Sequence, residues 1–197
     1  MYNRLLALAE RLSLVAVWLG GAMILFVAFM VTFDVFIRNI FNVTLGGADE
    51  ISGYLFAIAT AWSLPYALLL RANVRIDALY VLLSRRLRAV LDLLGLTLLG
   101  LFLGLLTWRV LAMWLESYSR NVLSVTPLHV PLKFPQGLWG LGLMLVCACV
   151  LLLLYGAISA LFRGDLKRVH ELIGAPSIEE EIEQEGIDLD TIKRQQD

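Results

Sequence analysis

Four long apolar segments constrain this chain of 197 residues more than any other feature. The clearest runs from Ile51 to Leu70 and holds twenty residues without a charge, with Asp49 and Glu50 before it and Arg71 after it. A helix rises about 1.5 Å per residue, so a helix of this length crosses about 30 Å, the thickness of the hydrocarbon core of a bilayer. The segment is therefore predicted to span a membrane as a helix.

The same reasoning predicts an all-α integral membrane protein with four transmembrane helices. Their expected spans are about residues 12–33, 51–70, 89–115 and 138–162, within a membrane domain of residues 1–163. The composition agrees, because 59% of the residues are hydrophobic and 17% are charged, whereas soluble domains average roughly a quarter charged residues. Residues 164–197 form a polar tail that holds ten of the seventeen acidic residues.

Shorter elements are expected beside the spans. Asp77 is a candidate N-cap for a short interfacial helix at 78–83, and Ser84 can cap the third long helix. Ser177 and Glu180 form a candidate capping box in the tail. The stretch 117–137 carries three prolines and is predicted to be extended or irregular.

The distribution of basic residues predicts the orientation. If both termini and the loop between the second and third spans lie on one side, that side holds twelve Lys or Arg. The other side then holds only Arg38, Arg120 and Lys133. Because cytoplasmic loops are enriched in Lys and Arg, both termini are predicted to be cytoplasmic.

Several small or polar residues lie inside the predicted spans. Gly20 and Gly21 are typical of sites where membrane helices pack closely. Cys147 and Cys149 are two residues apart, so they point to different faces of a helix and are expected to pack as small apolar residues. In the third helix, Arg109 is too far from Asp92 to pair with it, at about 25 Å along the axis. Each charge can snorkel to the membrane surface or meet another chain.

The sequence offers little that is typical of catalysis. His129 and His170 lie outside the predicted spans, so haem ligation within the membrane is not expected. No metal-ligand cluster, phosphate-binding loop or nucleophile motif is recognisable in the sequence. The acidic residues fall near the ends of the spans, whereas an ion-coupled transporter usually needs a carboxylate near the centre. The chain is therefore predicted to be an accessory subunit, with no enzyme activity and no cofactor of its own.

Charged motifs near the ends of the first two spans carry a family resemblance. They comprise Asp34 to Arg38 (DVFIR) followed by Asn42, the acid Glu50, and Arg71 with the later run Val74-Arg75-Ile76-Asp77. Thr126-Pro127-Leu128 with Pro131 adds to them. In this order, over roughly residues 10–162, the chain resembles the DctQ-like small membrane subunit of a tripartite ATP-independent periplasmic (TRAP) transporter. It departs from many relatives at Gly47, where they have Trp, and at Asn73, where they have His.

The resemblance implies a division of labour in the bacterial inner membrane. A periplasmic binding protein would capture an organic acid, and a large subunit of about twelve spans would transport it with sodium ions. The small subunit would be a scaffold with no substrate site, and sodium would bind the large subunit only. Candidate residues for the interface with the large subunit are Asp34, Arg38, Asn42, Asp49, Glu50, Arg71, Arg75, Asp77 and Arg109. Candidate contacts with the binding protein are Arg120, His129 and Lys133. Anchoring in the headgroup layer, or simple solvation in the loop, is the alternative role of these charges.

Two other functions are compatible with a small helical membrane protein. One is the membrane anchor of a respiratory enzyme complex, against which the absence of a histidine within the spans argues. The other is a small autonomous exporter, against which the absence of a carboxylate at mid-span argues.

Overall fold

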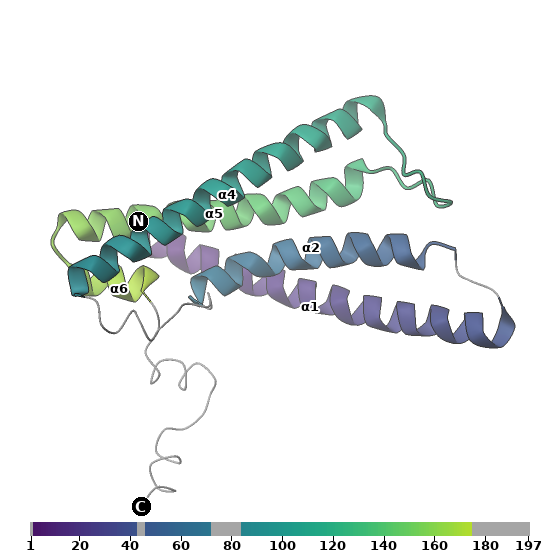
Figure 1. The fold of residues 1–197 in the computed structure, drawn as a ribbon, viewed down its shortest axis with the longest axis horizontal. Coiled ribbons are helices and arrows are strands. Elements are labelled where there is room, and N and C mark those ends of the chain that lie inside the picture. The colour runs from purple at the N-terminus through teal and green to yellow at the C-terminus, as the bar shows by residue number, and fades with distance from the viewer. Residues whose placement is uncertain (1, 43–45, 72–83, 175–197) are drawn as a thin grey trace, which may run out of the picture. The chain divides into compact units, whose positions relative to one another are not determined.

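The computed structural model describes residues 2–42, 46–71 and 84–174, and every element named in this part of the chain is a helix. The helices are α1 (Tyr2–Phe41), α2 (Ala48–Leu69), α4 (Arg85–Arg120), α5 (Lys133–Phe162) and α6 (Leu166–Ile173) (Figure 1). The first four are long and apolar enough to cross a membrane. The predicted all-α membrane fold with four spanning helices is therefore confirmed, whereas the orientation of the termini stays a prediction.

The helices extend beyond the predicted spans, and one expected irregular stretch is partly helical. The stretch 117–137 was expected to be extended, but α4 continues to Arg120 and α5 begins at Lys133. Pro135 thus lies in the first turn of α5, where its missing N–H leaves no intrahelical hydrogen bond unmade. The connection between α4 and α5 is therefore shorter than expected, and Pro135 does not prevent α5 from beginning at Lys133.

The described chain divides into two compact units, and the first comprises residues 1–72 and 97–152. Within this unit α1 packs against α2 through small side chains. A Cβ atom added at Gly20 would lie 3.0 Å from the Ala59 carbonyl oxygen and 3.0 Å from Ser63 Oγ, whereas one added at Gly21 would meet nothing within 4 Å. Of the two glycines predicted to mark close packing, only Gly20 does so.

Helix α5 contacts the other helices of the first unit through polar and small groups. Trp62 Nε1 of α2 donates a hydrogen bond to the Leu138 carbonyl oxygen at 2.8 Å. Cys149 is buried, with its sulfur 3.9 Å from Ser13 Oγ of α1, and Cys147 has its sulfur 3.2 Å from Thr107 Oγ1 of α4. Both cysteines are free thiols in helix packing, as predicted.

The second unit comprises residues 73–96 and 153–197, of which 84–96 and 153–174 are described. The predicted N-cap Ser84 accepts a hydrogen bond from the Leu87 backbone N–H at 3.5 Å. Helix α6 is capped by Asp165, which accepts a hydrogen bond from the Arg168 backbone N–H at 3.1 Å, and it buries Val169 and Ile173. The start of the polar tail is therefore an amphipathic helix.

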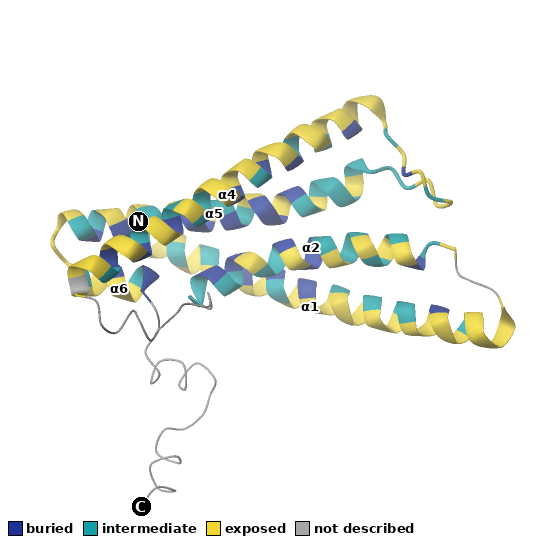
Figure 2. Cartoon of the chain, in the orientation of Figure 1, coloured by how far each residue is buried: buried dark blue, intermediate teal, exposed yellow. Residues whose placement is uncertain are grey.

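The other short elements expected beside the spans, at Asp77, 78–83, Ser177 and Glu180, lie outside the described residues. Within the described helices, buried residues follow one face, and the opposite faces are largely exposed (Figure 2).

Candidate functional site

The carboxylate of Glu50 joins the first turn of α2 to the loop between α4 and α5, residues 121–132. The Tyr54 hydroxyl, one helical turn further along α2, donates a hydrogen bond to Glu50 Oε1 at 2.8 Å. The Thr126 hydroxyl of the α4–α5 loop donates to Glu50 Oε2. Ser124 Oγ lies 2.7 Å from Thr126 Oγ1 and extends the chain of hydrogen bonds into the loop. Two segments 76 residues apart in the sequence are thereby held together.

The α4–α5 loop has its own hydrogen bonds, which present Thr126 to the carboxylate. The Ser124 and Val130 residues pair across the loop, with Ser124 N–H donating to the Val130 carbonyl at 2.9 Å and Val130 N–H to Ser124 Oγ at 3.1 Å. His129 N–H donates to the Thr126 carbonyl at 3.1 Å, which closes a tight turn. Pro127 occupies the second position of this turn, where its restricted φ is favourable. The loop is thus a compact hairpin rather than an extended linker.

An apolar contact lies beside the Glu50 hydrogen bonds. Gly47, just before α2, has φ +155, and a Cβ added there would lie 2.6 Å from Leu128 Cγ. Because a side chain at position 47 would overlap Leu128, the absence of one lets the loop lie against the start of α2. Gly47 and Leu128 therefore complete the contact that Glu50 and Thr126 make by hydrogen bonding.

The predicted contacts with a binding protein all lie in or beside the α4–α5 loop. Arg120 ends α4 and pairs with Glu116 at 3.5 Å, in an exposed ion pair. His129 Nδ1 lies 3.0 Å from the Pro127 carbonyl oxygen. Lys133 Nζ donates to Asn121 Oδ1 at 3.0 Å and lies 5.7 Å from the ring centres of two aromatic residues, Tyr118 and Phe134. These three residues therefore lie close in sequence to the Glu50 contact.

The predicted interface residues are spread over several elements. Asp34 is buried in α1, whereas Arg38 in its last turn is exposed. Asn42 follows α1 with φ 54 and donates its backbone N–H to the Arg38 carbonyl at 3.1 Å. Asp49 is exposed in the first turn of α2.

The remaining predicted interface residues lie elsewhere in the chain. Arg71 follows α2 with φ 58 and is half-buried, and Arg109 is exposed on α4. Arg75 and Asp77 lie outside the described residues. Glu50, one of the predicted interface residues, contacts the loop between α4 and α5 through its hydrogen bond with Thr126.

Sequence reasoning missed the partners of Glu50. Tyr54 lies four residues after Glu50, a spacing that places the two side chains on the same helix face, so this contact had a signal. Ser124 and Thr126 had none, because a hydrogen bond across 76 residues leaves no periodic pattern. Thr126 drew notice only through the Thr-Pro-Leu motif.

A comparison with known protein families identifies the family to which this chain belongs. The family model described as tripartite ATP-independent periplasmic transporters, DctQ component, matches residues 27–161, which is more than half of the chain. The chain belongs to the DctQ family. It is a small permease subunit of a TRAP transporter, and a transporter component rather than an enzyme. No curated protein and no solved structure matched it.

The matched region of this DctQ subunit contains the whole Glu50 contact, from Gly47 to Thr126 and Leu128. Membership makes the chain a multi-pass membrane protein of a system that also has a large membrane subunit and a periplasmic binding protein. It also sets aside the respiratory anchor and the autonomous exporter.

Proposed function

We propose that this subunit is a scaffold in a sodium-coupled importer of an organic acid, and that the outward face of α1 packs on the large subunit. The observation that carries the scaffold role is the division of α1 into two faces. Its buried residues are small or polar, namely Ser13, Ala16, Gly20 and Asp34. The large apolar side chains of α1 are therefore available to pack against a surface outside this chain.

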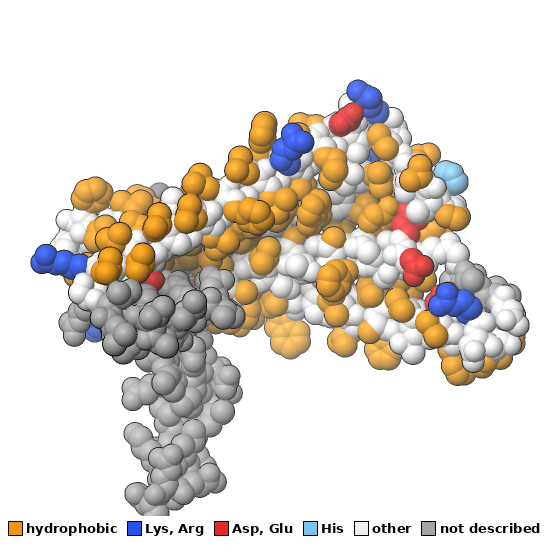
Figure 3. Space-filling view, in the orientation of Figure 1, with side chains coloured by type: hydrophobic (Ala, Val, Ile, Leu, Met, Phe, Trp, Pro, Cys, Tyr) orange, Lys and Arg blue, Asp and Glu red, His pale blue; other side chains and the backbone are white. Residues whose placement is uncertain are grey.

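The exposed face of α1 carries a straight stripe of large side chains, formed by Trp18, Leu25, Phe29 and Phe36. Each of these is more than half exposed. Counted from Trp18, they lie 7, 11 and 18 residues further on, close to whole numbers of helical turns, so they share one face of α1. Exposed hydrophobic side chains are also common on the face of the molecule shown in Figure 3.

Lipid could cover the stripe, but three aromatic rings in line also suit packing against a second protein. Aromatic side chains contribute a large contact area and are enriched in the cores of protein interfaces. The family supplies the partner, because TRAP systems contain a large membrane subunit. A broad apolar contact along α1 would anchor that subunit while it moves its substrate.

Photo-crosslinking in native membranes tests the scaffold role. A photoreactive phenylalanine analogue replaces Phe29, and Phe102 of α4, which is also more than half exposed, serves as the matched control. We expect a crosslink to the large subunit from position 29 and none from position 102. Crosslinks to lipid alone from position 29 would refute the α1 interface.

Sodium coupling and an organic acid substrate rest on what the DctQ resemblance implies, and sodium would bind in the large subunit. The whole three-component system, reconstituted in vesicles with its binding protein outside, tests both. We expect uptake of one member of a panel of carboxylates and sugar acids when sodium is high outside, and none when potassium replaces it. Equal uptake in both salts would contradict the coupling.

A further inference from the structure

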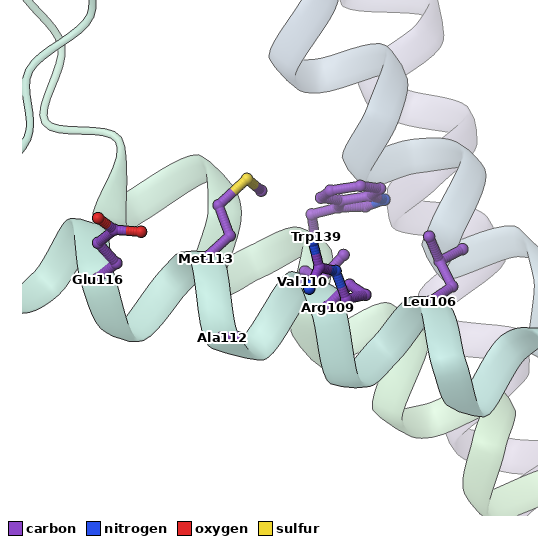
Figure 4. Close-up of a pocket in the computed structure, with 7 residues that line it drawn as sticks. All are labelled: Leu106, Arg109, Val110, Ala112, Met113, Glu116 and Trp139. Carbon is purple, nitrogen blue, oxygen red and sulfur yellow. The ribbon is translucent and has the colours of Figure 1, made fainter.

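A shallow hollow on the exposed face of α4 is lined by one basic and one acidic side chain, at different positions along the helix. The hollow has a volume of about 490 Å³ and is lined by Leu106, Arg109, Val110, Ala112, Met113, Glu116 and Trp139. Figure 4 shows Arg109 and Glu116 on the same helix, with Met113 between them along α4 and Trp139 reaching in from α5. We propose that this hollow binds the headgroup of an aminophospholipid, with the phosphate on Arg109 and the ammonium group on Glu116.

Arg109 is a charged residue on a helix that is long and apolar enough to cross a membrane, so its side chain needs an anion or water. It lies eleven residues before the end of α4 at Arg120, or about 16 Å along the helix axis. Its guanidinium group makes no hydrogen bond or ion pair with any other residue that the structure describes, and the side chain is exposed on an apolar helix. A charge in this environment is costly unless it reaches the interface or a counter-ion. A lipid phosphate is the anion that borders the hydrocarbon region.

The order of side chains along this face of α4 matches the order of groups in a phospholipid. Leu98, Phe102 and Leu105 precede Arg109 on the same face, and each is more than half exposed. They offer an apolar surface to an acyl chain. Arg109 follows at the level of a phosphate, and Glu116, seven residues or about 10 Å further along the axis, follows on the side of the headgroup.

Glu116 distinguishes an ammonium headgroup from other phospholipids. The Glu116 carboxylate lines the same hollow as Arg109 and lies beyond it toward the end of α4. Its ion pair with Arg120 is exposed on both sides, and such pairs contribute little free energy. A primary ammonium group in the hollow can therefore compete with Arg120 for the carboxylate. A methylated choline has no N–H to donate, and a glycerol headgroup has no positive charge.

Lipid titration of the full-length chain, purified in detergent and followed by native mass spectrometry, tests the proposal. We expect phosphatidylethanolamine to bind more tightly than phosphatidylcholine or phosphatidylglycerol. Arg109→Gln should weaken phosphatidylethanolamine binding by about tenfold, because it removes the charge-assisted hydrogen bonds to phosphate. Arg109→Lys, which keeps the charge, should lose less.

The matched controls separate the site from general charge attraction. Glu116→Gln should abolish the preference for phosphatidylethanolamine over phosphatidylcholine while phosphate binding persists. Arg120→Gln removes a cation from the same helix and should leave phosphatidylethanolamine binding undiminished. Equal binding of the three lipids by the unmodified chain would overturn the proposal, and so would equal losses in Arg109→Gln and Arg120→Gln.

A carboxylate of the large subunit is the other candidate partner of Arg109. If Arg109→Gln loses the large subunit during purification but binds phosphatidylethanolamine like the unmodified chain, Arg109 is an interface residue and the lipid site is wrong. The titration uses the small subunit alone, so its result does not depend on the scaffold role of α1.

Discussion

Thr126 donates its hydroxyl hydrogen to Glu50, and valine at this position would keep the shape of the side chain without the donor. The carboxylate would retain Tyr54 but lose its link to the α4–α5 loop. We therefore expect Thr126→Val to lower the free energy of unfolding by about 1–2 kcal/mol, because a charged acceptor loses a partner. Denaturant unfolding of the purified chain in detergent measures this change.

The control for Thr126 is Thr60→Val, the same chemical change on α2. Thr60 Oγ1 is exposed and donates only to the Phe56 carbonyl of its own helix, at 2.8 Å. Its replacement should change the unfolding free energy by less than about 0.5 kcal/mol. Glu50→Gln combined with Thr126→Val should cost less than the sum of the two single changes, because both remove the same contact. Additive losses would show that Thr126 acts independently of Glu50.

For single residues, the sequence predicts where a residue lies along a helix better than it predicts which residues its side chain contacts. Glu50 was expected just before the second span, and it lies in the first turn of α2, where an acid suits the helix dipole. Its bond to Thr126 was not foreseen, since it depends on how the loop folds back. The fold of the loop depends in turn on local bonds such as that between Ser124 and Val130, which no hydrophobic period encodes.

Among the elements, α1 and α2 show how one glycine can decide a helix contact. Leucine at Gly20 would place its Cβ 3.0 Å from the Ala59 carbonyl oxygen and from Ser63 Oγ, with further atoms beyond it. We expect Gly20→Leu to destabilise the chain by about 1–3 kcal/mol, because α1 and α2 must move apart. The measurement is the same denaturant unfolding in detergent.

Gly21→Leu is the neighbouring control for this prediction. A Cβ at Gly21 meets nothing within 4 Å, so the larger side chain should cost at most about 0.5 kcal/mol. A similar loss from both substitutions would mean that the contact with α2 does not explain the effect at Gly20, since leucine is a better helix former than glycine at either position.

Gly20 and Gly21 also show what the sequence can and cannot predict about the helices. Apolar runs such as Ile51 to Leu70 located the helices, because their length and lack of charge leave few other structures in a membrane. The face that each helix turns to its neighbour was not predictable. Gly20 and Gly21 are equally small and adjacent in the sequence, so only the three-dimensional structure shows that Gly20 is the one that packs against α2.

For the whole molecule, Arg38 at the end of α1 is a second candidate contact with the large subunit, separate from the outward stripe. It lies two residues after Phe36, the last residue of the stripe, so it points to a different face of α1, and it is exposed. An exposed cation at a helix end can pair with an acid on the partner, and its reversal places like charges together. We therefore expect Arg38→Glu to reduce recovery of the large subunit severalfold in a mild-detergent pull-down.

The solute carried by the residual complex should not change, because the proposed scaffold has no substrate site. Arg120→Glu is the matched control: it also reverses an exposed arginine at a helix end, but on α4, away from the α1 stripe in the sequence. It should retain the large subunit. If Arg38→Glu and Arg120→Glu recover the large subunit equally well, the end of α1 is not part of the interface. If Arg38→Glu changes which solute is transported, the small subunit takes part in substrate selection and the proposed division of labour is incorrect.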